Sequence, residues 1–248
     1  MRRLGIALAA TILTVLPAVI PTSPAYAASP ILPNLRMLTL SDFSLSSDPS
    51  LPGHKLLRFT ATIVNVGAAG GTFEVVGSRS STAETTMSVK QVLHNDDGST
   101  TTVPTAAQMV WDNGDGHNHW HTAGLEKYLL TTPSGHQLTS PKIGYCFFDN
   151  DPADLSLPGA PQSPVFLGCG TPDSLSVDTG LSVGWGDTYP ADRFEQWVDV
   201  TNEGNGQYHL TATADPQHFF SETNANDNST WADLSIRGNK VKVLRSGS

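Results

Sequence analysis

The sequence predicts an all-β fold, a β-sandwich of short strands with long loops that carry a functional site. Short segments of alternating apolar and polar residues recur along the chain. Glycine and proline, present at 22 and 17 positions, separate these segments. No segment places apolar residues at helical spacing over more than about three turns. Many short strands with frequent turn signals favour a sandwich over folds built on helices.

The strand predictions follow from the alternation in each segment. In the clearest one, Leu57, Phe59, Ala61 and Ile63 share one face. The turn at 95–98 predicts a hairpin, and a second turn is expected at 203–206. Residues 150–178 contain five prolines and are expected to form a long surface loop, of a kind that tends to carry function. The expected strands are 55–66, 72–76, 88–93, 99–103, 142–148, 196–200, 208–214 and 231–236.

Residues 1–27 have the features of a secretory signal peptide. Arg2 and Arg3 precede an apolar run, and Ala25-Tyr26-Ala27 matches a cleavage site. A membrane anchor is the alternative, which Pro17 and the shortness of the apolar run disfavour. We therefore expect a secreted protein in which residues 28–248 form a single domain.

The charge of the chain is acidic. It has 14 basic and 23 acidic residues, a net charge of −9 at pH 7, and loss of Arg2 and Arg3 would leave 12 basic residues against 23 acidic ones. This balance argues against nucleic acid or an anionic membrane surface as a partner. It favours cationic small molecules or basic proteins as substrates.

The chain has two cysteines, Cys146 and Cys169. In an exported protein, an even pair predicts a disulfide. The alternative is a pair of metal thiolates, which the absence of C-x-x-C spacing disfavours.

Three histidines stand at alternate positions, His117, His119 and His121. In an extended backbone, their imidazoles would leave on the same face, opposite Asn118 and Trp120. Imidazole groups suit zinc, copper, iron or nickel. Alternate side chains of a flat strand are about 7 Å apart, whereas ligand nitrogens lie about 2 Å from one ion. The strand must therefore bend, and the neighbouring Gly114 and Gly116 would allow this.

Several motifs in order resemble the catalytic domain of the lysyl oxidase family, secreted copper amine oxidases. The resemblance covers most of residues 34–231. Its segments are Asn34-Leu35-Arg36, 56–59 with 65–67, the three histidines, Lys142 to Asp149, Gly184 to Tyr189 with 191–201, and 206–228.

The resemblance implies a function and a cofactor. His117, His119 and His121 match the family's copper ligands, with zinc as the metal of an unprocessed form. Tyr189 and Lys142 would combine to form lysine tyrosylquinone. Such an enzyme uses dioxygen to convert primary amines, either small amines or lysine side chains of proteins, to aldehydes, ammonia and hydrogen peroxide.

Two points stay open within this resemblance. Lys142 is matched by its spacing to Cys146, because five residues separate it from Gly135-His136, where animal enzymes have none. Asp187 and Asp192 flank Tyr189, and either is a candidate for the general base.

Two other functions are compatible with the histidines. One is a non-catalytic extracellular β-sandwich module that serves adhesion or binds copper or zinc. The other is a zinc hydrolase, which the absence of an H-E-x-x-H motif disfavours.

Overall fold

The structure is a computed structural model that describes residues 27–113, 118–142 and 144–248. His117 and almost all of the predicted signal peptide therefore lie outside the described residues. Within the described residues, no helix has the length and apolar character needed to span a membrane.

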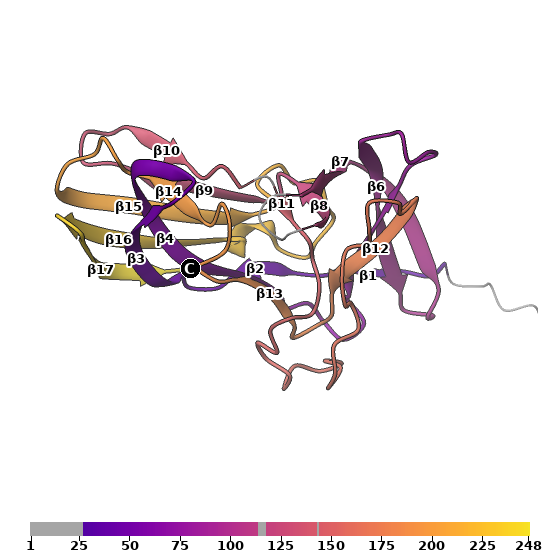
Figure 1. The fold of residues 1–248 in the computed structure, drawn as a ribbon. Coiled ribbons are helices and arrows are strands. Elements are labelled where there is room, and N and C mark those ends of the chain that lie inside the picture. Colours follow the sequence, from indigo (N-terminus) through magenta and orange to yellow (C-terminus); the bar gives the residue numbers. More distant parts are fainter. Residues whose placement is uncertain (1–26, 114–117, 143) are drawn as a thin grey trace, which may run out of the picture.

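The described residues form three antiparallel sheets (Figure 1). The first has the order β11-β8-β7-β6-β5-β12, with β1 beside β6. Its strands are β1 Pro30–Ile31, β5 Phe73–Ser78, β6 Thr86–Asn95, β7 Thr100–Asp112, β8 His119–Ala123, β11 Gly144–Tyr145 and β12 Ser176–Leu181.

The other two sheets pack against each other at the opposite end of an elongated molecule (Figure 1). The second has the order β10-β9-β15-β16-β17: Gln137–Thr139, Glu126–Thr131, Gly206–Ala214, Ser229–Arg237 and Lys240–Gly247. The third surrounds β4 (Leu51–Asn65) and contains β2 Leu35–Met37, β3 Ser41–Asp48, β13 Gly186–Tyr189 and β14 Trp197–Asp199. A single 3-10 turn, η1, covers Ala225–Asp227 among the described residues.

The core lies between the second and third sheets and continues into the first. Phe59 of β4 meets Tyr128 of β9 edge to face, with ring centroids 4.9 Å apart. Phe73 of β5 contacts both Phe147 and Phe220 in the same way. These residues belong to one cluster of buried side chains from all three sheets. The all-β prediction is confirmed.

Every other strand of the third sheet pairs with β4. The alternation of residues predicted β4 because its core face is apolar. Leu57, Phe59 and Ile63 are fully buried on the predicted core face. Leu56 and Val64, on the opposite face, are also buried, so both faces of β4 are covered at these positions. Partner strands also flank both edges of β4. The strand is longer than its prediction and extends back to Leu51.

Other predictions need correction. The strand expected at 142–148 is only the two-residue β11, and Ser176 to Asp178 of the expected loop belong to β12. The strands that were not expected are β1, β2, β3, β9, β10, β12, β13 and β17. Two of these are short and place charged or polar residues at buried positions, as with Glu126 in β9 and Asp187 in β13, so alternation is hidden. Between β11 and β12 the chain is an irregular loop, which Trp185 anchors by donating from Nε1 to the Pro161 carbonyl at 2.8 Å.

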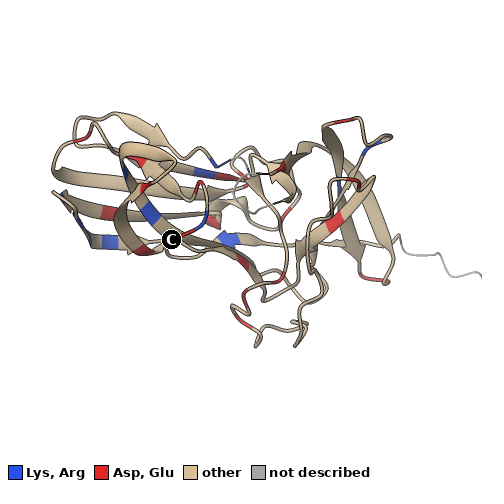
Figure 2. Cartoon of the chain, in the orientation of Figure 1, with Lys and Arg blue, Asp and Glu red and all other residues tan. Residues whose placement is uncertain are grey.

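Charged residues are dispersed over the molecule. Figure 2 shows acidic and basic residues interspersed along the strands and loops of all three sheets. Acidic residues are therefore not confined to one end of the elongated molecule.

The predicted disulfide between Cys146 and Cys169 is present, with the Cα atoms 5.7 Å apart. It ties the start of the irregular loop to a point close to β12. Replacing both cysteines with serine is expected to lower the free energy of unfolding by about 3 kcal/mol, since the cross-link restricts the unfolded chain. Urea unfolding of the metal-free double variant measures this. A midpoint unchanged from the wild type would contradict the expectation.

Candidate functional site

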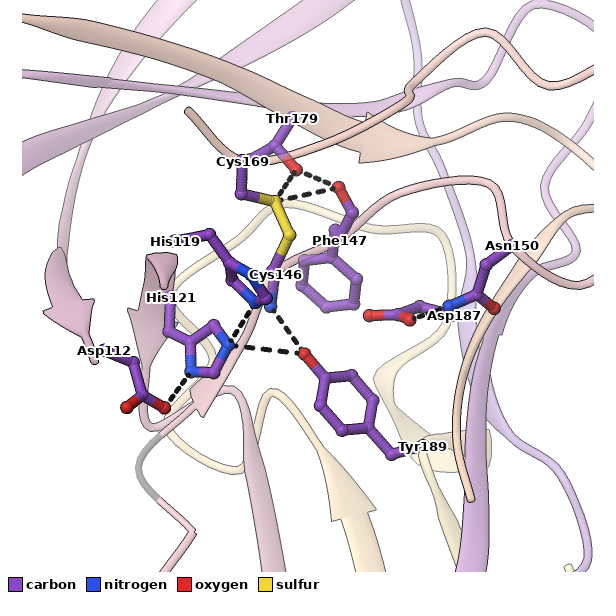
Figure 3. Close-up of a disulfide and its surroundings, with 10 residues drawn as sticks. All are labelled: Asp112, His119, His121, Cys146, Phe147, Asn150, Cys169, Thr179, Asp187 and Tyr189. Carbon is purple, nitrogen blue, oxygen red and sulfur yellow. Dashed lines mark hydrogen bonds and ion pairs between the residues drawn. A yellow bond between two sulfur atoms is a disulfide. The ribbon is translucent and has the colours of Figure 1, made fainter. Parts of the chain in front are cut away.

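Two of the three motif histidines come from β8, which runs beside β7. His119 lies opposite Asp112, and His121 lies opposite Val110. Their side chains converge, since the two Nε2 atoms are 2.9 Å apart (Figure 3). His121 is fully buried and His119 is half-buried. His117 lies outside the described residues.

The backbone bends immediately before β8. Asn118 has a left-handed φ of 43°, a conformation that asparagine tolerates better than most residues. The bend that the histidine spacing requires is therefore seen at Asn118. The expected contribution of Gly114 and Gly116 falls on residues outside the described part of the chain.

Asp112, at the end of β7, orients His121. Its Oδ2 lies 3.2 Å from His121 Nδ1, which directs Nε2 towards His119. A carboxylate behind an imidazole is the usual way to hold a ligating tautomer. Burial lowers the pKa of His121 from 6.5 to about 4, so the ring is neutral at pH 7. A neutral imidazole is the form that binds a metal.

The donor set fits a transition metal. His119 and His121 present two ring nitrogens to one point, and Asp112 supports one of them from behind. Within the residues that the structure describes, no cluster of three or more His, Cys, Asp or Glu side chains forms a complete metal site. The third ligand of the predicted set, His117, is outside them.

Tyr189, the last residue of β13, projects into the same place. Its hydroxyl lies 3.4 Å from His121 Nε2 and accepts a hydrogen bond of 3.2 Å from the backbone N–H of Cys146 (Figure 3). Its ring packs against Tyr145, with centroids 4.3 Å apart. Burial raises the pKa of the phenol well above its usual range. A neutral phenol is thus held beside the two imidazoles.

Lys142 lies in the loop between β10 and β11, not inside a strand as expected. Its Nζ is 3.6 Å from the centroid of the Tyr189 ring and 5.0 Å from that of Tyr145. The residue as a whole is half-buried, and its amine lies against these two rings. Burial of the amine lowers its pKa. The five residues between Gly135-His136 and Lys142 therefore do not separate the lysine from Tyr189.

The two candidate bases occupy different environments. Asp187 of β13 is fully buried, and its Oδ1 accepts a hydrogen bond of 2.6 Å from Asn150 Nδ2. Burial raises the pKa of Asp187 well above the usual carboxyl range. Asp192 is exposed on the surface. The structure brings Asp187 to the site and leaves Asp192 outside it.

A cavity of about 190 Å³ gives access to this cluster. Two of the residues that line it, Asn150 and Arg193, are exposed, so it communicates with solvent. A larger cavity of about 530 Å³ lies near Leu45 and His54 and contains none of the predicted site residues. The full lining of the smaller one is His119, Phe148, Asn150, Asp187, Thr188, Tyr189 and Arg193.

Sequence reasoning missed two acidic residues at the site, Asp112 and Glu126. Asp112 contacts His121 only because β7 and β8 pair in this register. Glu126 is buried in the first position of β9, with 7% of its surface exposed. A carboxylate at the start of an apolar strand segment was the only signal available for Glu126 in the sequence.

Residues 74–246 match the family model described as Lysyl oxidase. The matched region contains every candidate site residue. It begins after the segments at 34–36 and 56–67 that also resemble the family. A search of curated proteins found no match to the chain.

Proposed function

Because the chain belongs to the lysyl oxidase family, we propose that it is a secreted, copper-dependent amine oxidase. It converts primary amines to aldehydes and releases ammonia and hydrogen peroxide. Its substrates are small amines or lysine side chains, and its oxidant is dioxygen. The acidic charge of the chain, −9, suits cationic substrates of this kind.

His117, His119 and His121 hold the copper ion in this proposal, with zinc in its place in an unprocessed form. Bound copper would supply, with dioxygen, the redox chemistry that turns Tyr189 and Lys142 into lysine tyrosylquinone. The chain contributes the geometry: the Tyr189 hydroxyl is 3.4 Å from His121 Nε2, and Asp112 fixes that imidazole. The Cys146 N–H holds the phenol oxygen in place.

The observation that carries the proposal is the position of Lys142 over Tyr189. Its Nζ lies 3.6 Å from the centroid of the ring it must modify. An ordinary surface lysine is protonated at pH 7 and is a poor nucleophile. Desolvation lowers the pKa of Lys142 and so favours the neutral amine.

Asp187 is the general base that takes the α-proton from the bound substrate. It lines the same cavity as Tyr189, and Asn150 holds one of its oxygens. Because burial raises its pKa, the carboxylate form is lost at a higher pH than for an exposed aspartate. We therefore expect kcat to fall on acidification through a range above the ordinary carboxyl pKa.

The proposal is tested on protein produced with copper. Tryptic peptide mapping should find one covalent link between Lys142 and Tyr189. The visible quinone absorbance should shift when phenylhydrazine is added. Two unmodified peptides in copper-loaded, aerated protein would refute the proposal.

Replacing Asp187 with asparagine is expected to lower kcat by about 10²–10⁴-fold, the usual contribution of a general base. The matched control is Asp192→Asn, which changes an exposed carboxylate in the same segment and should leave kcat unchanged. Initial rates of peroxide release from a primary amine measure both. Equal losses in the two variants would contradict the assignment of Asp187.

We also propose that residues 1–27 are removed on secretion and that residues 28–248 form one catalytic domain. The mass of the protein recovered from culture medium tests the first point. An amino terminus at Ala28 supports it, and retention of Arg2 and Arg3 contradicts it.

A further inference from the structure

The cavity beside Tyr189 has a buried end and an exposed end. Tyr189 and Asp187, the cofactor tyrosine and the base of the proposed function, are buried. Arg193 and Asn150, which also line the cavity, are exposed. The half-buried ring of Phe148 adds an apolar surface to the lining. With a volume of about 190 Å³, the cavity is smaller than pockets for drug-sized ligands and suits a small amine or a single side chain.

Several polar groups of the lining already have partners within the protein. Asn150 uses both ends of its amide, since Nδ2 donates to Asp187 Oδ1 at 2.6 Å (Figure 3) and Oδ1 accepts from the Thr188 N–H at 2.8 Å. The Thr188 hydroxyl donates to Asp151 Oδ2 at 2.7 Å. A substrate could bind Asn150 or Thr188 only by replacing an existing hydrogen bond, which makes them weak anchors.

Two ionisable groups of the lining lack such partners in the part of the chain that the structure describes. Asp187 Oδ2 is buried and makes no hydrogen bond there. For Arg193 the structure records only hydrogen bonds of the backbone. A buried carboxyl oxygen is costly to leave unpaired, so Asp187 favours a bound group that carries an N–H donor. A guanidinium favours a carboxylate.

The backbone around Arg193 is held close to Tyr189. The N–H of Arg193 donates to the Pro190 carbonyl at 3.0 Å, and this closes a β-turn directly after Tyr189. In such a turn the first and last Cα atoms lie within about 7 Å of each other. The guanidinium of Arg58 on β4 donates to the Arg193 carbonyl at 2.9 Å and is itself paired with Asp48 at 2.9 Å. The turn is therefore anchored to the third sheet, which also contains Tyr189.

A positive charge at the exposed end of an amine site is unexpected from charge alone. The chain has a net charge of −9, and an amine substrate is itself a cation at pH 7. Arg193 repels such a cation as it enters unless the substrate also carries a negative group. A carboxylate on the substrate replaces this repulsion with a charge-assisted hydrogen bond, for which the planar guanidinium offers a bidentate geometry.

We propose that Arg193 binds a carboxylate of the substrate, so that the enzyme prefers primary amines that also carry a carboxylate. This inference rests on the proposed function and names its substrate class. The amine lies beside Asp187 and Tyr189, the connecting methylene groups lie along Phe148, and the carboxylate meets Arg193. Free lysine carries such a carboxylate itself, and a lysine in a protein has one where its neighbour is acidic.

The first experiment compares Nα-acetyl-lysine with its methyl amide, which keeps the same chain but has no carboxylate. Peroxide release from copper-loaded protein gives kcat and KM for each compound. We expect wild-type kcat/KM to be about tenfold higher for the acid, mainly through a lower KM. Arg193→Gln should reduce this preference to within about twofold, and Arg193→Lys should keep part of it, because lysine retains the charge without the bidentate geometry. A preference that survives in Arg193→Gln would overturn the inference, as would its absence from the wild type.

The matched control is Arg237→Gln, which removes an exposed arginine at the end of β16, outside the lining of the cavity. This variant should prefer the acid as strongly as the wild type does. Higher salt should weaken the wild-type preference, because solvent reaches Arg193 and screens its charge. Equal losses of preference in Arg193→Gln and Arg237→Gln would reveal a general effect of net charge and would overturn the role of Arg193.

Two peptides distinguish the sources of the carboxylate. Both have blocked ends and a single lysine, which is followed by aspartate in one peptide and by asparagine in the other. A higher kcat/KM for the aspartate peptide supports an acidic neighbour in a protein substrate as the group that Arg193 binds. Equal values for the two peptides, together with a preference for Nα-acetyl-lysine over its methyl amide, support a free amino acid.

A binding measurement separates a failure of this inference from a failure of the proposed function. Metal-free protein has no quinone in that proposal and does not consume the substrate, so titration calorimetry compares its affinity for the acid and the methyl amide. The wild type should bind the acid about tenfold more tightly, and Arg193→Gln should bind the two about equally. If no amine yields peroxide, the proposed function fails and this comparison still tests Arg193. Equal wild-type affinity for the two compounds would overturn the role of Arg193 alone.

Discussion

Replacement of Tyr189 with phenylalanine is expected to abolish amine oxidation, with a loss of at least about 10⁴-fold. The reason is that, in the proposed function, the cofactor formed from Tyr189 would carry the redox chemistry. The variant lacks the phenol oxygen that lies 3.4 Å from His121 Nε2. It keeps the ring that packs on Tyr145. The lost hydrogen bond from Cys146 should lower the free energy of unfolding by only about 1 kcal/mol. Loss of activity would therefore not reflect unfolding.

The measurements for Tyr189→Phe are peroxide release and reaction with phenylhydrazine. Tyr128→Phe is the matched control, since it also removes one buried hydroxyl, that of the 2.7 Å pair with Tyr145. The control should keep its quinone absorbance. A phenylhydrazine adduct in Tyr189→Phe would show that another residue forms the cofactor.

Replacement of Lys142 with alanine is expected to reduce amine oxidation to background and to leave metal binding intact. In the proposed function the lysine supplies the nitrogen of the cofactor, and it is not among the expected metal ligands. The same variant separates the oxidase from the non-catalytic metal-binding module. If the protein were the non-catalytic module, neither the wild type nor Lys142→Ala would oxidise amines.

The second expected effect of Lys142→Ala is on stability. Lys142 is a cation that acts on Glu126, Asp187 and Glu195 and lowers the pKa of each. Without it these carboxyl groups have a folded-state pKa further above the unfolded value. A raised carboxyl pKa stabilises the fold at low pH, and this contribution is lost as the pH rises through it.

Thermal unfolding of metal-free protein between pH 5 and 9 tests the effect of Lys142→Ala on stability. The variant should lose more stability than the wild type on the alkaline side. Lys127→Ala, which changes an exposed lysine on β9, serves as the control. Parallel stability profiles for Lys142→Ala and the wild type would contradict the expected coupling.

The alternation of apolar and polar residues predicted strands correctly where the core face of the strand is apolar. The alternation from Leu57 to Ile63 predicted the centre of β4, and the turn at 95–98 predicted the hairpin of β6 and β7. The prediction failed at β9 and β13, where buried positions are polar, and at β3 and β17, which are mostly exposed. Glu126 and Asp187 interrupt the apolar alternation of β9 and β13, and both lie near the site. At these positions the site uses a buried polar residue where the alternation that predicts a strand needs an apolar one.

The sequence by itself was enough to predict the β-rich class, the disulfide pair and four of the residues that lie together, namely His119, His121, Lys142 and Tyr189. The spacing of His119 and His121 was readable because a ligand pair two residues apart is a local feature. Only the tertiary structure placed Asp187 in the site and Asp192 on the surface, and put Asp112 behind His121. It also buried Glu126, which interacts electrostatically with Lys142. The positions of these side chains depend on the register of paired strands and on packing between segments that are far apart in the chain. A carboxylate acquires its proton affinity from the side chains packed around it, which its neighbours in sequence do not specify.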